Sequence, residues 1–167
     1  MPDEESNFET ILRVLVQHKV EFIVVGGLCA VLHGAPVQTY DLDIVPSRER
    51  ANLVRLEAAL RELGAYYREH PPHKIVPEAE RMTTTGHHLL HTTAGPLDVL
   101  GAIANQRDYD MLFPYTIEIE LSEAVWFRTL DLPTLILTKQ ETGRQKDRLV
   151  LPLLQQTLQE VERGERD

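Results

Sequence analysis

The fold is decided by residues 22–46, which read FIVVGGLCAVLHGAPVQTYDLDIVP. The first four residues are apolar, mostly β-branched and followed by two glycines, so we expect a short buried strand that ends in a tight turn. A short helix is predicted over residues 28–33, ended by Gly34. A second strand follows over residues 42–45 and is stopped by Pro46. The segment therefore predicts two strands joined through a helix.

Two acidic residues, Asp41 and Asp43, share one face of the second strand, because side chains alternate in direction along a strand. The other face carries Leu42 and Ile44. Neighbouring carboxylates repel each other unless a proton or a cation joins them. Magnesium resolves this repulsion because it takes oxygen ligands and keeps waters that a substrate phosphate can replace. An isolated Asp-x-Asp is equally compatible with a solvated strand start in which both acids are exposed.

A third carboxylate, Asp98, lies in residues 95–100, which read GPLDVL. An aspartate flanked by Leu97 and Val99 fits poorly with simple burial in a core. If this strand pairs beside the strand of Asp41, the third carboxylate reaches the same metal site. Two-metal phosphoryl transfer uses such an arrangement, in which one ion steadies the leaving pyrophosphate and the other lowers the pKa of the attacking hydroxyl.

The remaining elements complete the predicted fold. A helix over about residues 6–18 starts at a Ser6–Glu9 capping box, and a second helix, capped by Ser47, ends at Gly64. Further strands are expected at 88–90, 97–100 and 117–121, a loop at 68–86, and helix from Pro133 to near the end with a break at Gly143. We therefore predict a single α/β (α+β) domain over residues 1–167. Its mixed central sheet is flanked by helices, with a core over about residues 20–130 and a C-terminal helical segment over about residues 133–163.

Composition narrows the classes of function. The chain of 167 residues carries a formal net charge of -9, which disfavours unspecific binding to a phosphate backbone. A single cysteine, Cys29, excludes an intramolecular disulfide framework and fits a reducing compartment. The acidic, polar N-terminus and the lack of a long apolar run favour a cytoplasmic protein without a membrane partner. Positive charge is concentrated near the C-terminus, where four cations could hold a small anion: Lys139, Arg144, Lys146 and Arg148.

These motifs resemble the signature of the DNA polymerase beta-like nucleotidyltransferase superfamily. The likeness rests on Gly26-Gly27, on Asp41-Leu42-Asp43-Ile44, and on Asp98 as the third acidic residue. It is closest to the minimal nucleotidyltransferases and to the toxin-type group linked with abortive infection. In that group the stretch before the acidic pair often reads His-Gly…Arg-x-Thr-x-Asp-x-Asp. His33-Gly34 and Thr39 match this pattern, whereas Val37 stands where arginine is usual.

The resemblance continues in residues 133–139 and 143–147, which read PTLILTK and GRQKD. They are similar to the family's C-terminal motif, Leu-x-x-x-Lys…Arg-x-Lys-Asp. The resemblance implies that Lys139 and Lys146 contact a nucleoside triphosphate, with Arg144 in a supporting role, and that Asp147 holds a lysine or arginine in place. Gly26 and Gly27 would cradle the phosphates, although a tight strand-to-helix turn explains these glycines better when they are taken alone.

The resemblance thus implies transfer of a nucleoside monophosphate from a triphosphate such as ATP to an acceptor hydroxyl. The acceptor could be a protein, a transfer RNA or a small molecule, and a second protein of a toxin–antitoxin pair is a further expected partner. Asp41, Asp43 and Asp98 would be the catalytic carboxylates and would bind two Mg²⁺ ions, with Mn²⁺ as a substitute. The alternative is a degenerate member that binds nucleotide or a partner protein without catalysis. The presence of all three acids argues against that alternative, and the valine at position 37, in place of arginine, argues for it.

Overall fold

The computed structural model describes residues 7–69 and 71–166. Its centre is a mixed seven-stranded sheet with the strand order β3-β4-β5-β2-β1-β7-β6. The strands are β1 (Phe22–Val25), β2 (Leu42–Pro46), β3 (Tyr66–Tyr67), β4 (His87–Thr92), β5 (Gly95–Leu100), β6 (Thr116–Ser122) and β7 (Val125–Leu130). Two of the pairings, β2 with β5 and β1 with β7, are parallel, and the others are antiparallel. The predicted mixed α+β architecture is confirmed.

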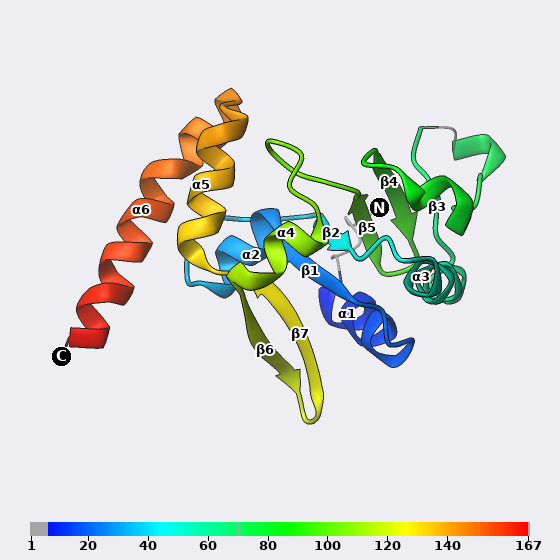
Figure 1. Cartoon of the computed structure of the whole chain (residues 1–167), viewed down its shortest axis with the longest axis horizontal. Coiled ribbons are helices and arrows are strands. Elements are labelled where there is room, and N and C mark those ends of the chain that lie inside the picture. The colour runs from blue at the N-terminus through cyan, green and yellow to red at the C-terminus, as the bar shows by residue number, and fades with distance from the viewer. Residues whose placement is uncertain (1–6, 70, 167) are drawn as a thin grey trace, which may run out of the picture.

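Six α-helices accompany the sheet in the described residues. They are α1 (Phe8–Gln17), α2 (Gly26–Leu32), α3 (Arg50–Glu62), α4 (Tyr109–Leu112), α5 (Leu132–Thr142) and α6 (Gln145–Arg166). Short 3₁₀ turns lie at Pro71–His73, Ala79–Thr83 and Phe113–Tyr115. α5 and α6 run in opposite directions side by side, and α1 and α3 contact each other, away from α5 and α6 (Figure 1). The break between α5 and α6 falls at Gly143, where φ is 64°, as the sequence predicts.

The core follows from the apolar pattern of the strands and helices. All four residues of β1 are buried, as are Leu42 and Ile44 of β2. α1 contributes Leu15 and α3 contributes Leu56 to the same buried cluster. Because Asp43 lies between Leu42 and Ile44, its side chain projects from the opposite face of the sheet. This second face also carries the buried Val45, so Asp43 is a half-buried polar group on a largely apolar strand.

The starts of two helices differ from those that the sequence predicts. α3 starts at Arg50 after an N-cap at Glu49, so the predicted Ser47 cap is wrong. Ser47 is buried instead, and its carbonyl accepts a hydrogen bond of 2.7 Å from the Asn52 side chain, which holds the chain extended up to Glu49. In the predicted capping box, Ser6 lies outside the described residues, and Asn7 caps α1.

The sequence does not predict β7, although this strand lies inside the sheet between β1 and the edge strand β6. It pairs with β1 on one side and with β6 on the other. The hydroxyl of the buried Thr129 donates to the Val24 carbonyl at 2.9 Å, which ties the strand to β1. The stretch VWFRTL mixes an exposed tryptophan with buried residues, so its alternation is too irregular to indicate a strand from sequence.

None of the helices in the described part of the chain combines the length and the apolar character needed to cross a bilayer.

Candidate active site

The parallel pairing of β2 with β5 places Asp43 directly opposite Asp98. In-register neighbours project from the same face of a sheet, so the two carboxyl groups meet. Burial, followed by the charge and hydrogen bond of Asp98 and the charge of Asp41, raises the pKa of Asp43 to about 7. The structure therefore brings two of the three predicted carboxylates into direct interaction, and the third acts on them through its charge.

Asp41 precedes the first residue of β2 and lies outside the β2–β5 register. Its carbonyl accepts a hydrogen bond of 3.1 Å from the Thr39 hydroxyl. Within residues 7–69 and 71–166, no three His, Cys, Asp or Glu side chains are grouped closely enough to hold a metal ion. The carboxylates thus form a close pair, Asp43 and Asp98, with Asp41 nearby.

Arg68 is a site residue that sequence reasoning missed. Its guanidinium donates to Oδ1 of Asp98 at 2.5 Å, and the two side chains are only 22% and 14% exposed. The position of Arg68 depends on the sheet, because its backbone N–H donates to the carbonyl of Leu89, the residue that pairs with Asp98. The two-residue strand β3 that leads to Arg68 is too short to leave a sequence signal.

The two glycines of the β1–α2 turn are explained by close approach to the acidic strand and to the segment that precedes it. Gly26 has a φ of +69°, and a Cβ there would lie 2.2 Å from Oδ2 of Asp43. A Cβ on Gly27 would lie 2.5 Å from the Thr39 hydroxyl oxygen. At Gly26, only glycine combines the positive φ with this proximity, whereas at Gly27 the proximity alone excludes a side chain. The Gly-Gly motif and the Asp-x-Asp motif are therefore parts of one packing arrangement.

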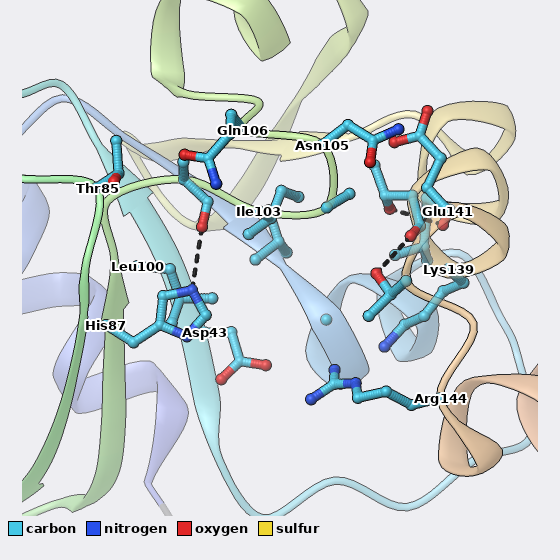
Figure 2. A pocket seen from close by; sticks show the side chains of 17 residues that line it. Asp43, Thr85, His87, Leu100, Ile103, Asn105, Gln106, Lys139, Glu141 and Arg144 are labelled. Carbon is cyan, nitrogen blue, oxygen red and sulfur yellow. Dashed lines mark hydrogen bonds between the residues drawn. The ribbon is translucent and has the colours of Figure 1, made fainter.

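A pocket of about 520 Å³ opens between these strands and α5 (Figure 2). Of the predicted site residues, Gly26, Asp43, Lys139 and Arg144 line it. The other lining residues are Val25, Thr85, His87, Leu100, Ala102, Ile103, Ala104, Asn105, Gln106, Leu135, Thr138, Glu141 and Thr142. A volume of this size is typical of small-molecule sites.

Asp147 organises the cationic wall of this pocket. It is completely buried, and its two oxygens accept hydrogen bonds of 3.1 Å each from Nζ of Lys139 and from Nε of Arg144. Burial acts to raise the pKa of this carboxyl, but the hydrogen bonds and charges of the two cations outweigh burial and hold the pKa below its ordinary value. The two cations that line the pocket thus share one buried anchor.

Lys146 is not brought to the pocket. It is exposed on α6 and is not one of the lining residues. Successive residues of a helix point about 100° apart, so a buried Asp147 leaves its neighbour Lys146 facing solvent. Of the remaining predicted residues, Gly27, Asp41, Asp98 and Asp147 lie next to the lining residues rather than among them.

No family model and no curated protein sequence matches the chain. Among solved structures, TM1012 of Thermotoga maritima, a protein assigned to the nucleotidyltransferases, aligns with a TM-score of 0.54 and 18% identity, over 86% of this chain and 87% of that chain. The antibiotic-resistance factor ANT(2'')-Ia aligns with a TM-score of 0.57 and 18% identity, over 90% of this chain and 81% of that chain. This chain has a nucleotidyltransferase fold.

Proposed function

We propose that this protein is a metal-dependent nucleotidyltransferase, which transfers a nucleoside monophosphate from a nucleoside triphosphate to an acceptor hydroxyl. One observation carries the proposal: the carboxylate pair of Asp43 and Asp98 adjoins a pocket whose opposite wall presents Lys139 and Arg144. Carboxylates at one end and anchored cations at the other suit a triphosphate that is split between its α- and β-phosphates. The acceptor hydroxyl would belong to a protein, a transfer RNA or a small molecule.

The donor set fits a hard divalent cation such as Mg²⁺ or Mn²⁺. Asp43 and Asp98 offer carboxylate oxygens side by side. Burial first, and then the charges of Asp98 and Asp41, raise the pKa of Asp43, and a bound cation would relieve the repulsion among these carboxylates. Asp41, which acts on Asp43 through its charge, would have to turn toward the pair to complete the set. When bound, the metal would neutralise charge on the phosphates and lower the pKa of the attacking hydroxyl.

The chain's own residues would act as follows. Asp98 orients the acceptor hydroxyl and takes its proton as the oxygen attacks the α-phosphorus. The bond from the α-phosphorus to its bridging oxygen breaks, and pyrophosphate leaves. Lys139 and Arg144 neutralise the charge of the leaving group, and Asp147 keeps both cations in place. Since Arg68 holds Oδ1 of Asp98, we assign the proton transfer to Oδ2.

A second candidate is a nucleotide-binding module without catalysis. The observation that favours it is the ion pair between Arg68 and Asp98, which occupies one oxygen of the carboxylate that the reaction needs. Val37, at the position where the resembling family has arginine, points in the same direction. Binding of nucleotide without magnesium-dependent turnover would support this candidate.

The proposal is tested by calorimetric titration of each nucleoside triphosphate, with and without Mg²⁺, into wild type, Asp43→Asn and the double variant Asp41→Ala/Asp43→Ala. Pyrophosphate release is then followed with bulk transfer RNA, the protein itself and simple alcohols as acceptors. Asp110→Asn is the matched control, because Asp110 is exposed on α4. We expect binding that depends on magnesium and is lost in both Asp43 variants. Binding by the double variant as tight as by wild type would contradict the assignment of the site.

A further inference from the structure

The pocket has a third wall that the phosphate chemistry does not use, namely the loop of residues 101–108 between β5 and α4. Ala102, Ile103, Ala104, Asn105 and Gln106 of this loop line the pocket. Figure 2 shows the Asn105 side chain beside Glu141 of α5 and the Gln106 side chain on the side of Thr85. The loop therefore closes the pocket between the sheet and the helix that carries the cations.

The base of this loop is fixed by its backbone. Ile103 and Arg107 exchange two hydrogen bonds of 2.9 Å each, which closes a tight hairpin. At the start of the loop, a Cβ on Gly101 would lie 2.3 Å from the Thr84 carbonyl oxygen, so Gly101 packs closely against the backbone at Thr84. Ala104 and Gln106 have φ values of 47° and 59°, in the left-handed region that residues other than glycine rarely adopt. Strain of this kind is found where a site needs one defined geometry.

A clamp from α5 fixes the loop on its other side. Arg107 donates through Nε and Nη2 to both oxygens of Glu141, at 3.0 and 2.5 Å. The backbone N–H of Asn105 donates to the same carboxylate, and the pKa of Glu141 is lowered first by the hydrogen bond from Arg107. Both charged groups of the clamp are therefore engaged with each other. Neither is free to bind a ligand by its charge.

The groups that remain free at the loop tip are amides. The side chains of Asn105 and Gln106 are exposed and have no hydrogen-bond partner among the described residues. Each amide offers a donor and an acceptor on a rigidly held backbone. In the same pocket, Leu100 and Ile103 give an apolar surface of the kind that the flat face of a nucleobase covers.

We propose that this loop reads the base of the bound nucleotide, and that Asn105 and Gln106 favour adenine over guanine. Adenine presents an amino donor next to the N7 acceptor, which an Asn or Gln amide matches with two hydrogen bonds. Guanine presents two acceptors on the same edge and is matched by a free arginine or lysine, but the cation of this loop, Arg107, is bound to Glu141. Glu141 is then a positioning residue, which acts through the loop. The inference rests on the proposed nucleotidyl transfer, since it assigns the base subsite of the same pocket.

The test is calorimetric titration of non-hydrolysable α,β-methylene analogues of ATP, GTP, CTP and UTP, each with Mg²⁺. We expect wild type to bind the ATP analogue about tenfold more tightly than the GTP analogue. In Asn105→Ala/Gln106→Ala this ratio should fall to within about twofold, and Glu141→Gln should lower it as well, although both amides are retained. Gln155→Ala removes an exposed amide from α6, outside the pocket, and should leave the ratio unchanged.

The outcomes separate the two proposals. If folded wild type binds none of the four analogues, the nucleotidyltransferase proposal fails and the base subsite fails with it. If nucleotides bind but wild type does not prefer the adenine analogue, or if the double variant keeps the wild-type ratio, only the base-reading role of the loop is overturned. A ratio that falls in the double variant and in Glu141→Gln, but not in Gln155→Ala, supports the inference.

Discussion

Lys139 donates a hydrogen bond of 3.1 Å to Asp147, a carboxylate with no exposed surface, and so a cation of the pocket wall is anchored from the interior of the protein. The anchor joins two helices, because Lys139 belongs to α5 and Asp147 to α6. Asp147 also holds Arg144, in the connection between the helices. The packing of α6 on α5 and the positive charge of the pocket therefore depend on one buried carboxylate.

Asp147→Asn should destabilise the protein by about 2 kcal/mol, because the change removes the charge that compensates Lys139 and Arg144. The effect is expected to stay below that of a fully buried pair, since Arg144 can reach water. Urea unfolding at pH 7 measures it. Asp110→Asn, on the exposed face of α4, is the control and should stay within about 0.5 kcal/mol of wild type. Equal stability of the two variants would show that the anchor does not stabilise the structure.

The raised pKa of Asp43 predicts how the stability of the metal-free protein changes with pH. A carboxyl with a pKa of 3.8 when unfolded and about 7 when folded keeps its proton longer in the folded state. The free energy of unfolding therefore decreases, through Asp43, as pH rises from about 4 to about 7. In the presence of a chelator, Asp43→Asn should gain stability relative to wild type over this range, and the difference should vanish below pH 4. Urea unfolding curves at several pH values test this, and a constant difference would contradict it.

Gly26→Ala should destabilise the protein by at least about 2 kcal/mol. The φ of +69° disfavours a side chain, and the new Cβ would meet Oδ2 of Asp43 at 2.2 Å. Thermal unfolding measures the effect. Gly164→Ala is the matched control, since a Cβ there meets nothing within 4 Å and alanine favours the helix, so its melting temperature should stay level or rise. If Gly26→Ala melted like wild type, the close packing of the turn on Asp43 would be refuted.

The features that could be predicted from the sequence are those that depend on residues close together in the chain. The β1 and β2 strands, the Asp-x-Asp pair and the break at Gly143 each depend on a few neighbouring residues, and the structure shows the strands and the break where they were expected. The placement of Asp98 beside Asp43 required only one correct strand pairing. The resemblance implies that Lys146 contacts the triphosphate together with Lys139, but the orientation of α6 turns Lys146 to solvent.

Residues whose positions depend on several non-local pairings could not be found in this way. Arg68 reaches Asp98 only because β3 pairs with β4 and β4 with β5. The clamp between Arg107 and Glu141 joins residues 34 positions apart through the packing of a loop on α5. Neither pair forms a recognisable spacing in the sequence, so no local pattern could have indicated it.

Arg68→Gln tests whether the ion pair with Asp98 restrains the metal site. Arg68 places a positive charge at 2.5 Å from Oδ1 of Asp98. This charge repels a divalent cation, and the ion pair occupies one of the two Asp98 oxygens that could bind the metal. Removing that charge should tighten the binding of Mg²⁺, or of Mn²⁺ as a probe, by about fivefold, equivalent to about 1 kcal/mol. Calorimetric titration of the metal into the nucleotide-free protein measures this affinity.

Arg50→Gln is the matched control, because Arg50 is 81% exposed and pairs with Glu80 at the surface. Its metal affinity should equal that of wild type. Weaker metal binding by Arg68→Gln would mean that Arg68 holds Asp98 in the geometry that the metal needs, rather than competing with the metal. In that case the ion pair would be part of a competent site, and its value as evidence for a module without catalysis would disappear.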